Sequence, residues 1–563
     1  MAEHVDVWAA NGRKNLFGQP VKLVEMQSEA GAIGAVHGAS ETGSLCSSFT
    51  ASQGLMLMIP VMHRLSGELK PVVLHVAART VGTHTMSIFG DHSDVMGCRN
   101  TGWAMLCSAS VQECADLAAV AHLSTIKGHV PFMHFFDGFR TSHEIQKISM
   151  LPEDELKKLI DKEALYDFKH HGLNPEHPVI RSTVTNPDMF FQSREANNSW
   201  YDRLPYIVED YMDKISELTG RTYKLFNYYG DPEAEHVVVA MGSVTGAIQE
   251  VVDSLNAQGK KVGYVQVHLF RPFSLEHFMQ ALPETVRSIT VMDRTKEPGA
   301  LGEPLFEDVC AAVEHTGRYI PIMACRYGLS SKDVPPASIH AVFRNMESLQ
   351  PKKHFTLGII DDVTHLSLPD VPIQIDDQGT VSCKFWGFGS DGTVGANKNS
   401  IKIIGDNTDM YVQAYFEYDT KKSGGVTKSH LRFGKNPIRS TYYIKQADFL
   451  ACHKQAYMDS YDIVSEVKDG GIFLLNCSWS PEELDQHLSN KVKRQIAEKG
   501  LRFYMIDATK IAEEIGLGSN RTNTVLQASF FKLTEILPIE DAVRYMKEAI
   551  AKTYLAKGEA SFP

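Results

Sequence analysis

The sequence predicts an α/β protein of about three or four domains, and two observations carry that prediction. The chain has 563 residues, whereas single hydrophobic cores stop growing at about 250 to 300 residues. Short apolar runs of strand length alternate with longer segments of helical periodicity, which is typical of parallel sheets covered by helices. The composition, 43% hydrophobic and 22% charged, is that of a folded globular protein.

The first two hundred residues predict one α/β domain. Buried strands are expected at four apolar runs, which are residues 20–26, 45–50, 71–78 and 130–136. Residues 110–127 have the periodicity of a helix. Two charged helical stretches, 152–171 and 202–220, extend this domain and lead out of it.

A second α/β unit follows. Residues 235–273 read as strand, glycine turn, helix, glycine stop and strand, the pattern of a βαβ unit. Residues 287–313 repeat the theme, and the Pro- and Asp-rich run 365–379 predicts a domain boundary. The third unit opens with a strand at 380–389.

A helix with clear end signals is expected near the close of the chain. Ser480 is the predicted N-cap, Pro481 the first helical residue, Glu483 the capping-box partner and Gly500 the stop. A strand at 501–507 follows, so the third unit is α/β as well.

Charge and cysteine content exclude several classes of protein. The net charge is −12, from 56 basic and 68 acidic residues, which argues against a nucleic-acid-binding protein but allows a local phosphate site. The nine cysteines form no C-x-x-C pair, so zinc-knuckle and iron–sulfur motifs are absent from the sequence. Their odd number predicts free thiols in a reducing compartment. Without a signal or transit pattern or an apolar run of about 20 residues, we expect a soluble cytoplasmic protein that does not bind membranes.

Residues 25–43, EMQSEAGAIGAVHGASETG, place a carboxylate just ahead of a surface of Gly and Ala. If a helix begins near Glu29, the carboxylate lies by its positive end and stays ionised. The small residues beyond it let a backbone or a flat ligand approach closely. That arrangement suits a hydrogen bond to a ring nitrogen of a bound heterocycle. The alternative is an ordinary acidic first turn before a tightly packed helix.

The strand at 71–78 ends at Arg79, where open α/β sheets bind ligands. An arginine there suits bidentate capture of a carboxylate or phosphate, and the alternative is a side chain that leaves the core for solvent. His75, on the same strand, is interpreted as a core histidine with satisfied hydrogen bonds. Asp91, His92 and Asp94 are interpreted as turn-capping residues rather than metal ligands, and Asp137-Gly138 fits a routine turn as well as a site edge.

Two features of the third unit predict an anion site. Gly389, Gly392, Asn397 and Lys398 belong to a glycine-rich loop that can expose backbone N–H groups beside a lysine. Its spacing matches neither the Walker A nor the dinucleotide-binding motif. A basic cluster that includes Lys421, Lys422 and Arg432 reverses the local charge of an acidic protein, which suits a phosphorylated ligand, an acidic partner or simply a solvated face.

Long strings of the sequence resemble the single-chain pyruvate:ferredoxin (flavodoxin) oxidoreductases. They run from residue 6 to beyond residue 530 and include GRKNLFGQPVKLVEMQSEAGAIGAVHGA, FTASQGLMLMIP, SIFGDHSDV, VPFMHFFDGFRTSHEIQKI, DRTKEPGA, FWGFGSDGTVGANK, IIGDNTDMYVQAYFEYDTKKSGG and SHLRFG. The resemblance implies oxidative decarboxylation of pyruvate on thiamine diphosphate, transfer of two electrons through 4Fe–4S clusters to ferredoxin or flavodoxin, and transfer of the acetyl group to coenzyme A.

The same resemblance implies three domains and two residue roles. Residues 1–225 resemble a thiamine-diphosphate pyrimidine-binding domain, 226–378 a transketolase C-terminal-like domain, and 379–563 a gamma-type domain associated with coenzyme A. Glu29 takes the position of the glutamate that hydrogen-bonds the pyrimidine ring, and Arg79 that of the arginine that holds the substrate carboxylate. Coenzyme A is expected at the glycine-rich loop and basic cluster of the third domain. The resemblance also implies that full-length members form homodimers.

Three family segments have no match in the 563 residues. These are an N-terminal Y-P-I-T-P segment, a cysteine-rich ferredoxin-like domain, and the G-D-G…N motif that binds the cofactor's diphosphate through Mg²⁺. We therefore expect an N-terminally truncated piece or a split subunit, inactive alone and completed by a partner chain. The alternatives are an oxidoreductase for another 2-oxo acid, and a non-catalytic coenzyme A-binding or assembly module.

Overall fold

A computed structural model describes residues 2–181, 183–377, 379–419, 424–516, 518 and 521–555. The chain forms two compact units. Unit 1 consists of Met1–Ser142 and Ile148–Ile375, and unit 2 of His143–Lys147 and Asp376–Pro563. The main break lies inside the run 365–379, where the sequence predicts a boundary.

Unit 1 contains a five-stranded sheet in the order β1-β2-β4-β3-β9. Its strands are β1 (Cys46–Thr50), β2 (Val72–Ala78), β3 (Ala104–Ser108), β4 (Phe132–Asp137) and β9 (Leu269–Arg271). β1 to β4 are parallel, and β9 pairs antiparallel with β3. β2, β3 and β4 are buried along nearly their whole length, since both faces of a parallel sheet are covered by helices. The strands predicted at 45–50, 71–78 and 130–136 are confirmed.

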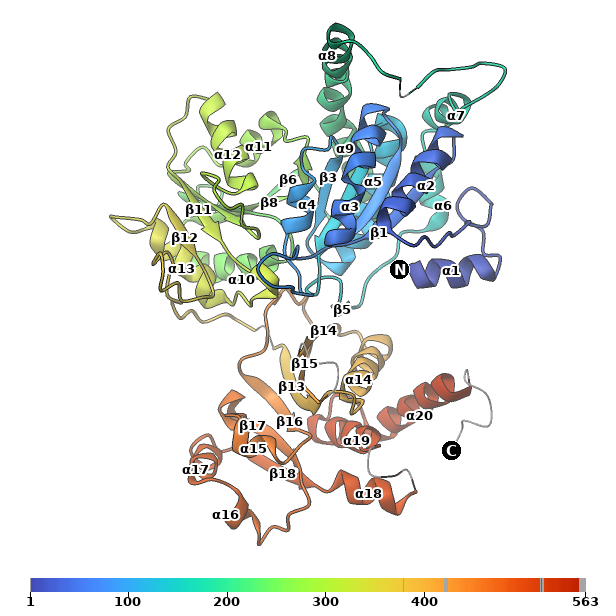
Figure 1. Cartoon of the computed structure of the whole chain (residues 1–563). Helices are drawn as coiled ribbons and strands as arrows, with labels where there is room; N and C mark the ends of the chain where they lie inside the picture. The colour runs from blue at the N-terminus through green and yellow to red at the C-terminus, as the bar shows by residue number, and fades with distance from the viewer. Residues whose placement is uncertain are drawn as a thin grey trace. The chain divides into compact units, whose positions relative to one another are not determined.

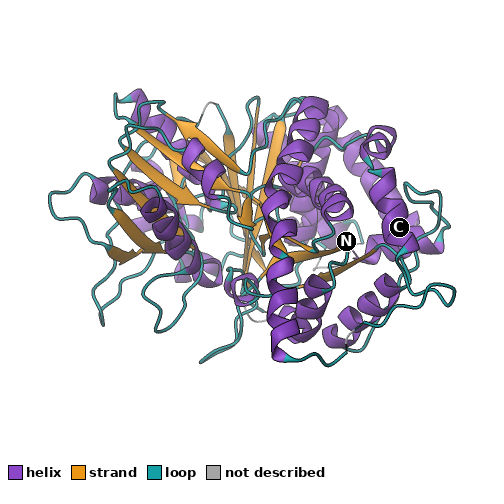
Figure 2. Ribbon diagram, turned by 90° about the horizontal axis from the view of Figure 1, so that it is seen from above, coloured by secondary structure: helices purple, strands orange, loops and turns teal. Residues whose placement is uncertain are grey.

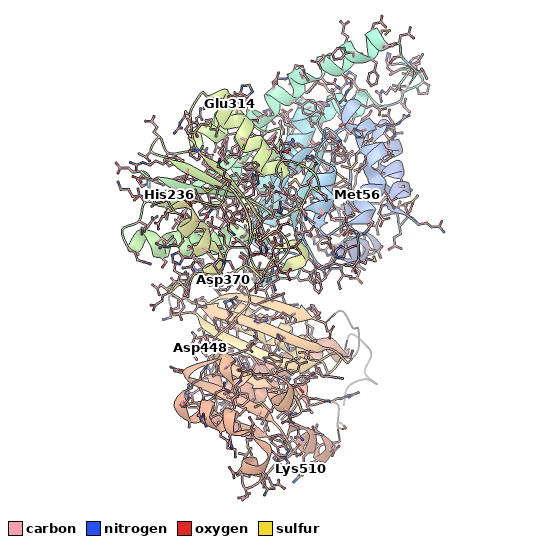
Figure 3. All side chains as sticks on the ribbon, turned by 60° about the vertical axis from the view of Figure 1, so that its left-hand side comes forward. Met56, His236, Glu314, Asp370, Asp448 and Lys510 are labelled. Atoms are coloured by element: carbon pink, nitrogen blue, oxygen red, sulfur yellow. The ribbon has the colours of Figure 1, made fainter. Side chains whose placement is uncertain are left out.

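The second sheet of unit 1 has six strands in the order β12-β11-β10-β7-β8-β6. They are β6 (Phe226–Gly230), β7 (His236–Ala240), β8 (Val262–Val267), β10 (Ser288–Asp293), β11 (Ile322–Arg326) and β12 (His354–Thr356). β7 and β8 are parallel neighbours joined by helix α10 (Val244–Ala257), so the predicted βαβ unit is confirmed. Figure 3 labels His236 on β7, whose Nδ1 lies 2.8 Å from the Ser288 hydroxyl on β10.

Helices flank the strands on both sides (Figures 1 and 2). Besides α10, those of unit 1 are α1 (Ala2–Ala10), α2 (Glu29–Glu41), α3 (Gln53–Gly67), α4 (Ser93–Gly97), α5 (Val111–Gly128), α6 (Glu153–Leu159), α7 (Lys162–His170), α8 (Pro187–Ala196), α9 (Asn198–Thr219), α11 (Leu275–Ala281), α12 (Pro304–His315) and α13 (Pro336–Met346), with a 3₁₀ turn η1 (Leu329–Ser331). α2 packs on α3 and β1, and α5 packs on α9. Among the described residues, no helix is long and apolar enough to cross a bilayer.

Unit 2 is built on a seven-stranded mixed sheet in the order β18-β17-β16-β13-β15-β14-β5. Its strands are β5 (Ile145–Gln146), β13 (Val381–Phe388), β14 (Tyr411–Tyr418), β15 (Val426–Gly434), β16 (Ala447–Cys452), β17 (Val467–Asn476) and β18 (Arg502–Ile506). Its helices are α14 (Thr393–Asn407), α15 (Tyr457–Ser460), α16 (Leu484–His487), α17 (Asn490–Glu498), α18 (Ala508–Glu514), α19 (Asn523–Thr534) and α20 (Ile539–Leu555), with a 3₁₀ turn η2 (Val464–Glu466).

Two local predictions are wrong. Residues 21–26 form a loop in which Val21, Val24 and Met26 are exposed, because no described strand offers them a ladder partner. The single helix expected from Ser480 to Gly500 is divided between α16 and α17. Leu488 is extended, and Ser489 starts α17 as its N-cap by accepting a hydrogen bond from the Val492 N–H. The bond from the Ser480 N–H to Glu483 does form at 2.8 Å, and the predicted stop at Gly500 is confirmed by its φ of +57°.

Candidate functional site

Glu29 is the first residue of α2, so the helix start that the sequence analysis took as a condition is present. Ser28 is the N-cap, and its hydroxyl accepts a hydrogen bond from the Gly31 N–H at 3.3 Å. The Glu29 carboxylate packs against Gly54 in the first turn of α3, where an added Cβ would lie 2.7 Å from the Glu29 Oε1. Only glycine leaves room for the carboxylate at that point.

Beyond Glu29, the outward face of α2 carries small residues. Ala30, Gly34, Ala35 and Gly38 are exposed. A Cβ added at Gly34 or Gly38 would meet no atom of the described residues within 4 Å. The small-residue surface predicted from the sequence is therefore open to an approaching group.

Arg79 follows β2 directly and is partly buried at the carboxyl edge of the five-stranded sheet. Its guanidinium lies over the Phe139 ring, 5.0 Å from the centroid. Its Nε is buried and has no hydrogen-bond partner among the described residues, and the same is true of the Thr50 hydroxyl at the end of β1. Buried polar groups are normally paired, so both atoms are candidates for a ligand contact.

Asp94 joins the Arg79 backbone to the turn that carries Gly54. Its Oδ2 accepts hydrogen bonds from the Ser52 N–H at 2.7 Å and the Arg79 N–H at 2.9 Å. Burial raises the pKa of Asp94 to about 7, although the N–H groups of Arg79, Ser52 and Val95 oppose that shift. Sequence reasoning interpreted Asp94 as a turn cap, and nothing local shows that it reaches two other loops.

The three residues interpreted as turn-capping, Asp91, His92 and Asp94, point to different partners. Asp91 accepts a hydrogen bond from the Ser93 N–H at 2.9 Å, so its predicted turn-capping role is confirmed. His92 contacts Asp137 at 2.5 Å, and Asp94 faces Ser52 and Arg79. These three side chains therefore do not converge on one ion.

Asp137, at the end of β4, links the two sheets of unit 1. Its Oδ2 lies 2.7 Å from the Arg294 Nη1, which follows β10. It also accepts hydrogen bonds from the N–H and hydroxyl of Ser243, just ahead of α10. Burial raises the pKa of Asp137, but the charges of Arg294 and His92 outweigh it and hold the pKa well below its ordinary value. The predicted turn begins here, since the Thr141 N–H bonds the Asp137 carbonyl, but the side chain has a second, long-range role.

A chain of hydrogen bonds crosses one face of the five-stranded sheet. It runs from the Ser108 hydroxyl to His134 at 2.8 Å, on to His75 at 3.0 Å, and from His75 to His122 of α5 at 3.2 Å. His75 is thus the satisfied core histidine that the sequence predicts. Burial lowers the pKa of His122 to about 4 and that of His134 to about 3, so all three rings are neutral at pH 7.

The His122 ring gives a testable pH dependence. Because the unfolded chain takes up this proton near pH 6.5 and the folded chain only near pH 4, the stability contributed by a neutral His122 is present above pH 6.5 and is lost as the pH falls towards 4. We expect the free energy of unfolding of the wild type, relative to His122→Gln, to fall by about 2 to 3 kcal/mol between pH 7 and 4. Urea titrations at several pH values measure it.

The comparison with the variant is needed because other buried groups change the stability in the opposite direction. Burial raises the pKa of Asp94, Glu144 and Asp293 to about 7, so their contribution to the free energy of unfolding rises as the pH falls. A constant difference between wild type and His122→Gln across this pH range would contradict the prediction.

The glycine-rich loop of unit 2 leads into the N-terminus of α14. Gly392 is the N-cap with a φ of +84°, and the Gly389 N–H donates to the Gly425 carbonyl at 2.7 Å. Asn397 is buried, and its Nδ2 has no hydrogen-bond partner among the described residues. Lys398 is exposed, with its ammonium 5.3 Å from the Phe416 ring centroid.

The other residues predicted to bind coenzyme A are not seen to join the glycine-rich loop in a site. Arg432 is buried, and its guanidinium donates to the Gln413 side chain at 3.0 Å and to the carbonyls of Ser440 and Tyr442 at 3.2 and 2.9 Å. Its donors are used inside the fold, where sequence reasoning expected a surface cation. Lys421 and Lys422 lie outside the residues that the structure describes.

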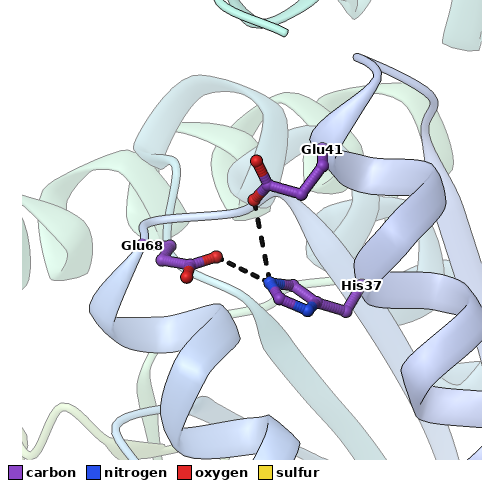
Figure 4. A group of neighbouring side chains, drawn as sticks. All are labelled: His37, Glu41 and Glu68. Carbon is purple, nitrogen blue, oxygen red and sulfur yellow. Dashed lines mark hydrogen bonds and ion pairs between the residues drawn. The ribbon is translucent and has the colours of Figure 1, made fainter. Parts of the chain in front are cut away.

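One cluster that sequence reasoning missed lies between α2 and the end of α3 (Figure 4). The His37 Nε2 is 2.7 Å from Glu68 and 3.7 Å from Glu41. Geometry alone would allow a metal ion here. However, Lys70 lies 2.8 Å from the Glu41 carboxylate and Arg181 contacts it at 2.5 Å, so cations of the chain already balance it. Burial raises the pKa of Glu41, but its hydrogen bonds to Lys70 and Arg181 outweigh this and lower the pKa to about 2. We interpret the cluster as an ion-pair network.

The chain matches three family models. "Pyruvate flavodoxin/ferredoxin oxidoreductase, thiamine diP-bdg" matches residues 1–213, "Pyruvate:ferredoxin oxidoreductase core domain II" matches 234–339, and "Pyruvate ferredoxin/flavodoxin oxidoreductase" matches 382–561.

Curated relatives match over nearly the whole chain. The pyruvate:ferredoxin oxidoreductase of Moorella thermoacetica is 57% identical over 561 residues, which is 99% of this chain and 48% of that protein. The pyruvate-flavodoxin oxidoreductase of Klebsiella pneumoniae is 57% identical over 562 residues, 100% of this chain and 48% of that protein. The mitochondrial pyruvate dehydrogenase [NADP(+)] of Euglena gracilis is 49% identical over 562 residues, 99% of this chain and 31% of that protein. The chain thus spans about half the length of the first two relatives.

Proposed function

Because the chain belongs to the pyruvate:ferredoxin/flavodoxin oxidoreductase family, we propose that it supplies part of the active site for thiamine-diphosphate-dependent oxidative decarboxylation of pyruvate to acetyl-CoA and CO₂. The observation that carries the proposal is the position of Glu29. It begins α2, packs against Gly54 and is followed by an open surface of small residues.

These residues fit the aminopyrimidine ring of thiamine diphosphate. A flat ring can approach the bare face of α2, and the Glu29 carboxylate can accept a hydrogen bond from a ring nitrogen. When bound, the cofactor supplies the carbanion and the electron sink that removal of CO₂ requires. Mg²⁺ and the diphosphate group are assigned to the part of the family's length that this chain does not match.

Arg79 is proposed to bind the carboxylate of pyruvate. It lies at the carboxyl edge of a parallel sheet, and its Nε has no partner among the described residues. The Phe139 ring packs against the guanidinium, with its centroid 5.0 Å away. A guanidinium matches a carboxylate in shape and charge.

Arg79→Met is expected to raise the KM for pyruvate between about tenfold and a hundredfold, because a hydrogen bond to a charged group contributes about 1.5 to 3 kcal/mol. Initial rates at varied pyruvate concentration measure it, in a hybrid enzyme in which this chain replaces the matched part of the Moorella thermoacetica relative. Arg99→Met is the control, since Arg99 pairs with Glu297 at 2.9 Å and is partly exposed. An unchanged KM for Arg79→Met, or an equal rise for Arg99→Met, would count against the assignment.

We propose that coenzyme A binds unit 2 near the glycine-rich loop. Gly389, Gly392, Asn397 and Lys398 support this, since the loop ends at the N-terminus of a helix and Asn397 holds a buried amide without a partner among the described residues. Arg432 is left out, because its donors bond within the fold.

We propose no single electron acceptor for this chain. The names of the relatives differ, as ferredoxin, flavodoxin and NADP(+) all occur among proteins that match the same residues. We infer that residues 1–563 do not decide the acceptor, and that 4Fe–4S clusters belong to the unmatched part of the family's length. A homodimer of the whole protein, or a partner chain that brings that part, completes the active site. We propose a cytoplasmic location, which the reducing environment expected from an odd number of cysteines supports.

A hybrid enzyme tests the function. The matched part of the Moorella thermoacetica relative is replaced by this chain, and the rest of that protein is kept. We expect the hybrid enzyme to reduce a viologen dye only when both pyruvate and coenzyme A are present, and to be slower with 2-oxobutyrate or 2-oxoglutarate. The unmodified relative is the control. A folded hybrid enzyme that ignores pyruvate but turns over another 2-oxo acid would contradict the substrate assignment, and one that binds coenzyme A without turnover would contradict the enzyme assignment.

A further inference from the structure

A single buried carboxylate contacts both regions that carry the proposed catalytic groups. The Asp94 side chain is fully buried. Its Oδ2 accepts the Ser52 N–H at 2.7 Å and the Arg79 N–H at 2.9 Å, and its Oδ1 accepts the Val95 N–H at 2.7 Å. The two longer-range bonds span 42 and 15 residues of sequence.

The two loops that Asp94 joins are tied together a second time. Ser52 has a φ of +56°, a conformation that non-glycine residues adopt only when the surroundings enforce it. Its hydroxyl donates to the Thr80 carbonyl, one residue after Arg79. The turn between β1 and α3 is therefore held against the end of β2 both by Asp94 and by the Ser52 hydroxyl.

That turn also supports Glu29. Gly54 lies two residues after Ser52, and the Glu29 carboxylate packs on it so closely that an added Cβ would be 2.7 Å away. A shift of Ser52 would thus move the surface on which Glu29 rests, and the same shift would release the Arg79 backbone.

We infer that Asp94 is a positioning residue, which holds Arg79 and the Gly54 surface beneath Glu29 in one arrangement and so sets the distance between the carboxylate-binding and pyrimidine-binding groups. This inference rests on the proposed function. Asp94 itself touches neither group's side chain and acts through the backbone.

The chemistry at this position requires a carboxylate. All three partners are N–H donors, and a carboxylate offers acceptors on both oxygens. An asparagine offers only one acceptor oxygen. In one orientation its NH₂ group faces the N–H groups of Ser52 and Arg79, and in the other it faces that of Val95, so a donor loses its partner in either case.

The test compares Asp94→Asn with Asp91→Asn in the hybrid enzyme. Asp91 is the matched control, because it is 2% exposed and lies three residues before Asp94. It accepts the N–H groups of Ser93 and Ser330, not those of Ser52 or Arg79. We expect Asp94→Asn to lower kcat/KM for pyruvate between about tenfold and a hundredfold, since small misplacements of catalytic groups have effects of that size. The KM for coenzyme A should stay within about twofold in both variants.

Each outcome bears on the inference. Equal values of kcat/KM for pyruvate in Asp94→Asn and Asp91→Asn would overturn it, as would equal losses for pyruvate and coenzyme A. If Asp94→Asn does not fold, Ser52→Ala replaces it, because this variant leaves the Asp94 bonds in place and removes only the contacts of the Ser52 hydroxyl with the Thr80 carbonyl and the Gln53 side chain. An unchanged KM for pyruvate in Ser52→Ala would overturn the inference as well. A hybrid enzyme inactive with the wild-type residues would instead count against the proposed function itself.

Discussion

Replacing Glu29 by Gln is expected to lower the rate of pyruvate decarboxylation in the hybrid enzyme by about two to four orders of magnitude. Glutamine keeps the shape of the side chain but cannot hold the negative charge that strengthens a hydrogen bond to a ring nitrogen, and general acid–base groups contribute about 10²- to 10⁴-fold.

The measurement is the steady-state rate at saturating pyruvate and cofactor, so that a change in binding alone is excluded. Glu25→Gln is the matched control, because Glu25 is exposed in a loop one helical turn ahead and should leave the rate within about twofold. Gly54→Ala is a second variant, which keeps the carboxylate but removes the space it occupies. A rate for Glu29→Gln equal to that of Glu25→Gln would contradict the proposed role of Glu29 at the pyrimidine ring.

The second large effect is expected on stability, from Asp137→Asn. The variant leaves the Arg294 guanidinium without its carboxylate in a site where both side chains are at most 3% exposed. Breaking a buried ion pair from one side costs about 3 to 5 kcal/mol, because the remaining charge stays buried. The Ser243 N–H and hydroxyl at the start of α10 also lose part of their acceptor. Urea unfolding of this chain, followed by fluorescence and circular dichroism, measures the loss.

Asp308→Asn is the control for this prediction. Asp308 pairs with Arg271 at 2.7 Å, and both side chains are about a quarter exposed, so its removal should cost about 1 kcal/mol or less. The double variant Asp137→Asn with Arg294→Gln removes the orphaned charge and should recover part of the stability. Equal losses for Asp137→Asn and Asp308→Asn would show that the buried pair does not hold the two sheets of unit 1 together.

The sequence alone determined those features that depend on neighbouring residues. The βαβ unit of β7, α10 and β8 follows from apolar runs and glycine turns within 32 residues. The surface of Gly and Ala that follows Glu29 is also visible in the sequence alone. The resemblance to the pyruvate:ferredoxin (flavodoxin) oxidoreductases also follows from the sequence, because matching long strings of residues requires no knowledge of contacts. In the same way, Arg79 could be placed at the edge of a sheet from the strand before it.

Only the tertiary structure decided which distant groups meet. The loop at 21–26 has the composition of a strand, but a strand needs a neighbour for its hydrogen bonds, and the described residues supply none. Asp94 and Asp137 resemble turn residues in the sequence, yet each satisfies its charge with partners up to 157 residues away, as in the pair of Asp137 and Arg294. Arg432 resembles a surface cation, yet three acceptors surround it in the core. Side-chain partners of this kind depend on how whole elements pack, and local pattern carries no information about them.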